Sequence, residues 1–179
     1  FGSSVSLSED GKTIAVGAWG NDGRGDDSGH VRVYQIDDSG SNLTQIGEDI
    51  DGEAACDYSG WSVSLSADGE TVAIGAPEAG SNGVWTGQVR VYRIDSGGSI
   101  WEPLGQTIYG DATIDQFGHS LDVATIGNSI IIGSPGSWED EDRPGYVRVF
   151  TLEGNDDFGT NTWKQIGLDF IGEADSDEF

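Results

Sequence analysis

Short stretches in which apolar and polar residues alternate recur along the chain, separated by turns. In the first stretch Val5 and Leu7 alternate with serines, and further apolar segments follow at residues 13–18, 31–34 and 43–50. A period of two is typical of β-strands, and the Asp10-Gly11 pair favours a hairpin between the first two. Helical periodicity is not seen in these segments. We therefore predict one four-stranded antiparallel sheet from this part of the chain.

The same pattern returns with a period of 58 residues. The phrase that opens at Phe1 is repeated at Ser59 and at Phe117, which divides the chain into repeats 1–58, 59–116 and 117–178, with Phe179 opening a fourth. Extra length in the third copy falls within residues 151–162, so we expect an exposed hairpin there. Sheets repeating at this interval are typical of β-propeller blades. The predicted fold is all-β, with three four-stranded antiparallel blades that form part of a larger propeller or repeat array.

Three blades are fewer than a closed propeller usually needs, so two sheet faces would be left without a neighbour. The sequence contains no methionine and starts inside a repeat. We therefore expect either a piece of a longer array or a chain that closes with partner chains. An isolated, closed ring of three blades would contradict this expectation.

The charge of the chain restricts its partners. Eight Lys and Arg residues face 32 Asp and Glu residues, for a formal net charge of −24. Phosphate contacts would work against this field, which argues against nucleic acid and against anionic membrane surfaces. Apolar runs are much shorter than the roughly 18 residues that a membrane span requires, so we predict no span in this segment. Cys56 is the single cysteine, which excludes an internal disulfide.

Each repeat carries one arginine between two valines in its third predicted strand. These residues are Arg32, Arg90 and Arg148. Strand geometry places them on the face opposite the valines, and a covered arginine needs a carboxylate partner. The recurring acidic positions Glu53, Asp111 and Glu173 are the predicted partners, within or between blades. We interpret these residues as structural ion pairs rather than as ligand-binding groups.

Two acidic segments are candidates for binding. Residues 21–27 are rich in glycine and carboxylates, so Asp22, Asp26 and Asp27 are candidate metal ligands. The matching loops of the other repeats do not keep the carboxylates, which favours a solvated, charged loop over a metal site. Arg24-Gly25-Asp26 also spells a tripeptide that integrins recognise, and composition alone accounts for it. The second segment, residues 138–142, sets Trp138 beside a run of carboxylates. Either segment could contact a partner, and the candidate residues are Asp22, Arg24, Asp26, Asp27, Trp138, Asp140 and Asp142.

The repeated phrases identify a family resemblance. Phe117-Gly118 and Gly75-Ala76-Pro77 match the two name-giving motifs of FG-GAP repeats, found in integrin α-subunit propellers and in bacterial and algal relatives. Phe1-Gly2 with Gly17-Ala18-Trp19, and Gly133-Ser134-Pro135, depart by one residue, and Ser59 replaces an aromatic. The resemblance covers essentially the whole chain and implies a propeller with adhesive, extracellular roles. Calcium-binding relatives carry an Asp-x-Asp-x-Asp-Gly loop where this chain has short turns, so that calcium site is not carried over.

Catalytic constellations are not evident. His30 and His119 lie 89 residues apart in different phases of the repeat, and Cys56 has no obvious histidine partner. We predict a non-catalytic adhesion or structural-interaction module, secreted or at the cell surface. Its partner would be a protein, a glycan or further copies of the same repeat. The alternatives are a scaffold that depends on Ca²⁺, and a propeller segment of a larger secreted enzyme.

Overall fold

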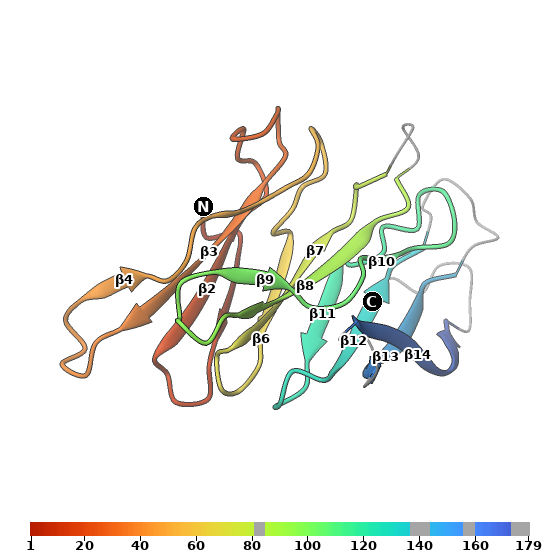
Figure 1. Cartoon of the computed structure of the whole chain (residues 1–179). Helices are drawn as coiled ribbons and strands as arrows, with labels where there is room; N and C mark the ends of the chain where they lie inside the picture. The colour runs from red at the N-terminus through yellow and green to blue at the C-terminus, as the bar shows by residue number, and fades with distance from the viewer. Residues whose placement is uncertain (81–84, 137–143, 156–159, 173–179) are drawn as a thin grey trace.

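Three antiparallel β-sheets follow one another along the chain, and together they make an all-β fold (Figure 1). This computed structural model describes residues 1–80, 85–136, 144–155 and 160–172. The first sheet contains β1 (Ser4–Leu7), β2 (Thr13–Ala18), β3 (His30–Ile36), β4 (Leu43–Gln45) and β5 (Ile50–Asp51). The second contains β6 (Ser62–Leu65), β7 (Thr71–Ala76), β8 (Gln88–Ile94), β9 (Trp101–Pro103) and β10 (Ile108–Tyr109). The third contains β11 (Ser120–Val123), β12 (Ser129–Ser134), β13 (Tyr146–Asn155) and β14 (Thr160–Ile171).

Each sheet has four strand positions, but the outermost position differs between repeats. In the first two sheets the expected fourth strand is broken: β4 and β5 both pair with β3, and β9 and β10 both pair with β8. Gly47 and Gly105 lie in the breaks, with φ of +73° and +79°. These are left-handed conformations that glycine adopts without strain. In the third sheet β14 pairs with β13 along its length and accommodates the irregularity as a bulge.

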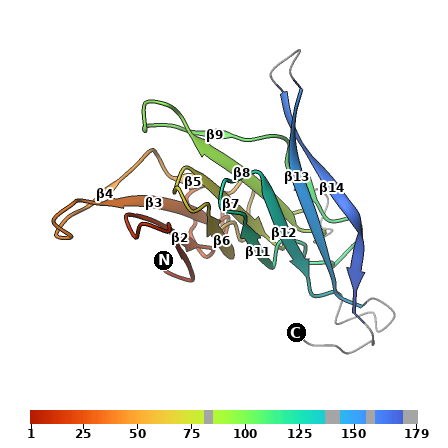
Figure 2. The same ribbon diagram turned by 90° about the horizontal axis from the view of Figure 1, so that it is seen from below.

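The three sheets pack face to face, one after another in chain order (Figure 2). One buried apolar cluster joins the first sheet to the second and includes Val31, Val33, Val63 and Ile74. Another joins the second to the third and includes Val89, Val91, Phe117 and Ile132. The valines that flank Arg32 and Arg90 therefore face the following sheet. Within the described ranges, no helix has the length and apolar character needed to cross a membrane.

The innermost strands approach one another closely because their residues are small. A Cβ atom added to Gly17 would lie 2.2 Å from the Gly60 carbonyl oxygen, and one added to Gly75 would lie 2.1 Å from the Gly118 oxygen. Serine hydroxyls bridge the same junctions: Ser4 Oγ donates to Gly60 O and Ser62 Oγ donates to Gly118 O, both at 2.7 Å. The Gly-Ala and Ser-Val-Ser phrases thus have a packing role.

Tryptophan fills the wider outer space between sheets. Trp101 and Trp163 are 8% and 3% exposed. Each indole Nε1–H donates to a carbonyl of the preceding repeat, Ile46 O at 2.9 Å and Leu104 O at 2.7 Å. The first repeat has Leu43 at this position, and that side chain is 62% exposed.

Candidate functional site

The arginines of β3, β8 and β13 each pair with a carboxylate, either within the same repeat or across a junction between sheets. Arg32 forms three hydrogen bonds with Asp49 of its own repeat, at 2.8–2.9 Å. Arg148 makes the same kind of contact with Asp169, at 2.9 and 2.8 Å. These guanidinium groups hold the pKa values of both carboxyls below their ordinary range. The within-repeat partners thus differ from the three acidic positions that the sequence suggested.

Those suggested positions supply contacts between repeats. Glu53 Oε1 lies 3.6 Å from Arg90 Nη1, and Asp111 pairs with Arg148. Arg90 has no counterpart of Asp49, because threonine stands at position 107, and it donates instead to Asp51 O at 2.8 Å and Ser59 Oγ at 3.1 Å. Glu173 lies outside the described residues.

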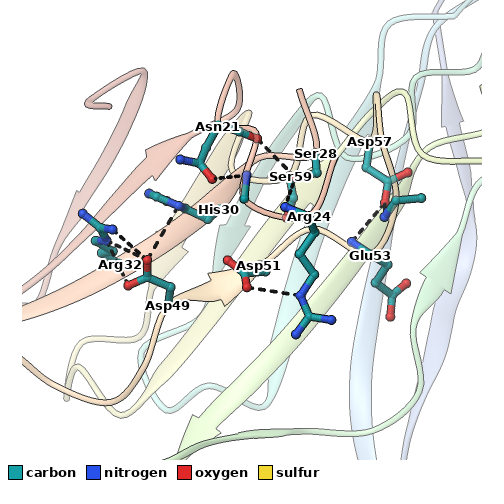
Figure 3. Close-up of polar contacts among 12 residues, drawn as sticks. Asn21, Arg24, Ser28, His30, Arg32, Asp49, Asp51, Glu53, Asp57 and Ser59 are labelled. Carbon is teal, nitrogen blue, oxygen red and sulfur yellow. Dashed lines mark hydrogen bonds and ion pairs between the residues drawn. The ribbon is translucent and has the colours of Figure 1, made fainter. Parts of the chain in front are cut away.

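The acidic loop of residues 21–28 folds over β5 and the turn that follows it (Figure 3). The Asp27 N–H donates to Asp22 Oδ1 at 2.9 Å, and Arg24 Nε donates to Asp51 Oδ2 at 3.2 Å. Asp27 adopts a φ of +51°. The backbone oxygen of Asp26 accepts a hydrogen bond from the Cys56 N–H at 2.8 Å. The loop is therefore shaped largely by its own contacts and by the neighbouring turn.

Between the first and second sheets this loop borders a cavity of about 650 Å³. Arg24 and Glu48 stand at its rim, Arg90 and Tyr92 come from β8, and Trp101 begins β9. The Arg24 side chain is 65% exposed, whereas that of Arg90 is 9% exposed. The further lining residues are Asp49, Ile50, Asp51, Gly52, Glu53, Ser99 and Ile100. Hydrogen-bond donors, hydrogen-bond acceptors and aromatic rings therefore all line this one cavity.

One potential metal-binding group occurs beside this cavity, and the sequence did not suggest it. Within the described ranges, His30, Asp49 and Asp51 bring three ligand atoms within 4.8 Å of one another, whereas Asp22, Asp26 and Asp27 form no such group. Both carboxylates already pair with arginines, Asp49 with Arg32 and Asp51 with Arg24. Burial, and then the charge of Arg32, lower the pKa of His30. A cation would have to displace two guanidinium groups, so these residues fit a metal poorly.

A second feature that the sequence did not suggest is a row of aromatic rings near the inner strands. Trp19 lies 5.2 Å from Tyr58 and 5.7 Å from Trp61, and Trp61 lies 5.4 Å from His119, measured between ring centroids. Trp61 and His119 both follow the glycine of the opening phrase, which was the available signal.

The candidates Trp138, Asp140 and Asp142 lie outside the described residues.

Comparison with solved structures defines the class of fold. A putative 6-phosphogluconolactonase from Bacteroides uniformis matches with a TM-score of 0.57 and 16% identity, over 92% of this chain and 39% of that one. One from Bacteroides fragilis matches with 0.56 and 17%, over 94% and 41%. Saccharomyces cerevisiae Sqt1 matches with 0.54 and 11%, over 94% and 35%. The chain thus spans well under half the length of these structures. Their likeness confirms a β-propeller-like fold.

One family model matches the opening repeat. The FG-GAP repeat model matches residues 1–34. The chain therefore carries an FG-GAP repeat, as its Phe-Gly and Gly-Ala phrases predict. No curated protein matches the sequence.

Proposed function

We propose that this chain is a non-catalytic interaction module that works outside the cell or at its surface. It binds a protein or glycan partner through the cavity between the first and second sheets. The observation that carries the proposal is this cavity of about 650 Å³, which falls within the usual size range of ligand sites. The FG-GAP repeat and the propeller-like fold support an interaction role of this kind.

The lining of the cavity favours a polar partner. Arg24 and Glu48 are exposed at the rim and offer a donor and an acceptor. Deeper in, Arg90 is held by Asp51 O and Ser59 Oγ, so its guanidinium is fixed in position. Tyr92 and Trp101 add aromatic surface next to these charged groups. Hydroxyl-rich glycans and extended peptides both combine polar edges with faces that stack on aromatic rings.

Binding to immobilised glycans and attachment of cells to a surface coated with the chain test this proposal. Arg24→Ala with Glu48→Gln should remove binding, because both residues lie on the cavity rim. Lys12→Gln serves as the control, since Lys12 pairs with Asp38 in an exposed position away from the cavity. Equal binding by all variants would place the partner elsewhere. Absence of glycan binding and of cell attachment by the unmodified chain would overturn the proposal.

A Ca²⁺-dependent scaffold is the alternative suggested by the group of His30, Asp49 and Asp51. Ca²⁺ prefers six to eight oxygen ligands, and both carboxylates are already paired with arginines. We therefore expect millimolar Ca²⁺ to leave the melting temperature unchanged. A saturable rise in that temperature, lost in Asp51→Asn, would favour the cation-dependent scaffold.

The third alternative is a propeller segment of a larger secreted enzyme. Two of the similar structures are putative 6-phosphogluconolactonases, at 16% and 17% identity. A likeness at that level concerns the fold, whereas the FG-GAP repeat favours a non-enzymatic role. Lactone hydrolysis by the purified chain, measured directly, would reverse this preference.

A further inference from the structure

Three aromatic side chains meet at the junction between the first and second sheets, near the inner strands. Trp19 follows β2, whereas Tyr58 and Trp61 lead into β6. The Tyr58 and Trp61 ring centroids lie 6.4 Å apart, so these two rings contact each other as well as Trp19. Trp19 is 37% exposed and the other two side chains are half-buried. We call these three residues the aromatic trio.

The fold does not require three aromatic rings at this place. The same positions of the next junction hold Pro77, Gln116 and His119, and a buried apolar cluster joins the sheets there as well. The tryptophans that fill the space between sheets are covered, since Trp101 and Trp163 are only 8% and 3% exposed. The aromatic trio is therefore particular to the first junction, and its rings remain open to solvent in part.

Two carboxylates lie beside the aromatic trio without a partner of their own. A Cβ atom added to Gly20, the residue after Trp19, would lie 3.3 Å from Asp27 Oδ1. The Asp27 backbone oxygen accepts a hydrogen bond from the Tyr58 N–H at 3.2 Å. Glu78 stands just beyond β7, the strand that pairs with β6. Within the described ranges, neither of these carboxylates forms a hydrogen bond or an ion pair.

Both carboxylates act on the same ring. Burial raises the pKa of the Tyr58 hydroxyl, and the negative charges of Glu78 and then of Asp27 raise that pKa further. Burial also raises the pKa of Glu78 itself. A partly buried carboxylate that lacks a partner is energetically unfavourable. A cation placed between the rings and these carboxylates would relieve that cost.

The side chain of a lysine or an arginine matches these surroundings in both shape and charge. Cations are attracted to the faces of Trp and Tyr rings, and the N–H groups of both side chains donate hydrogen bonds to carboxylates. Their aliphatic stems pack on apolar surface while the charged end stays at a polar edge. The formal charge of −24 attracts basic partners as well. A neutral sugar would stack on the rings but would leave both carboxylates without a counter-charge.

We propose that the aromatic trio, Asp27 and Glu78 form a binding site for a basic side chain, lysine or arginine, of a partner protein. The charged end of that side chain meets the ring faces and the two carboxylates, and its aliphatic stem packs on the indoles. The site goes beyond the function proposed above, because none of these residues lines the cavity between the first and second sheets.

Titration of the whole chain with Nα-acetyl-arginine amide and with Nα-acetyl-lysine amide, followed by NMR of the indole N–H signals, tests this site. We expect saturable shifts of the Trp19 and Trp61 signals, with dissociation constants in the millimolar range for ligands of this size. The Trp101 and Trp163 signals should stay in place, because those indoles are buried and donate to backbone carbonyls. The neutral citrulline and Nε-acetyl-lysine derivatives should cause no saturable shift.

Variants of the two kinds of group separate their contributions. Glu78→Gln should weaken binding about 2–5-fold, as expected for the loss of one partly exposed ion pair. Glu70→Gln is the matched control, because it makes the same charge change at the opposite end of β7. Tyr58→Gln should weaken binding about 2–5-fold through the lost ring. This variant should fold, because Gln116 holds the same turn position with a φ of +52°, against +54° for Tyr58, and circular dichroism checks it.

Trp19 and Trp61 signals that do not move with the basic ligands would overturn the proposal. Equal binding of the charged and neutral ligands, or binding that neither Glu78→Gln nor Tyr58→Gln weakens, would overturn it as well. Shifts caused by a neutral oligosaccharide but not by the basic ligands would identify a glycan surface instead and would also overturn it. Glu48→Gln, on the cavity rim, should leave binding of the basic ligands unchanged, and Glu78→Gln should leave glycan binding unchanged, so the two proposals fail separately.

Discussion

Replacing Phe117 by alanine should destabilise the fold far more than the same change at Phe1, although both residues open a repeat. Phe117 is 0% exposed and packs against Tyr146 and Phe150 at centroid distances of 6.2 and 6.3 Å. Removal of a fully buried phenylalanine side chain costs about 3–5 kcal/mol. Phe1 is 72% exposed, so scaling by its buried fraction gives about 1 kcal/mol.

Urea denaturation followed by tryptophan fluorescence measures the difference. For a chain of this size, the Phe117→Ala loss corresponds to a fall in melting temperature of about 6–20 °C. The m-value should be compared as well, because a repeat array can unfold in steps. Equal losses for the two variants, or a loss below about 1 kcal/mol for Phe117→Ala, would refute the packing argument.

Three further outcomes are expected. Asp169→Asn should lower the free energy of unfolding by about 2–4 kcal/mol, because it leaves the largely buried Arg148 with a weakened partner. Asp111→Asn should lower it by less than about 1 kcal/mol, because Asp111 is 72% exposed. Urea denaturation compares the two variants, and equal losses would contradict the view that Asp169 is the stronger partner of Arg148. Burial lowers the folded-state pKa of His30, so the unfolded chain takes up the proton first and stability falls as pH drops below about 6.5. His30→Gln, which places the residue of the second repeat at this position, should make the melting temperature depend less on pH between neutral pH and about pH 5. An unchanged dependence on pH would contradict the burial of a neutral His30. Gly75→Ala should prevent the close approach to the Gly118 oxygen, which a Cβ atom would meet at 2.1 Å; a melting temperature equal to that of the unmodified chain would show that the junction can shift.

The order and type of the strands could be predicted because short-range patterns control them. Alternation in Ser4–Leu7 and the β-branched run in Thr13–Ala18 need only local geometry to be read as strands. The break between β4 and β5 was not predicted. It coincides with Gly47, where a Cβ atom would lie 2.6 Å from the ring of Trp101, a residue of the next repeat. A contact between repeats therefore accompanies a local irregularity.

Less of the candidate site could be predicted from the sequence. The positions of Arg32, Arg90 and Arg148 recur in every repeat, so a common ion-pairing role could be inferred. Their within-repeat partners recur in only two of the three copies, since Asp49 and Asp169 match a threonine at position 107. The cavity beside Arg24 joins residues from two sheets, and no local pattern indicates which of them meet.

The repeat, its strand pattern and the FG-GAP motifs could be recognised without a structure, because they depend on residue types at fixed short spacings. Which of the equivalent residues are buried and which are exposed became clear only from the packing of the sheets. Val5 and Val63 stand at the same position of the same phrase, yet only Val63 has a neighbouring sheet to cover it. Burial depends on what lies across the junction, and that partner is distant in the sequence.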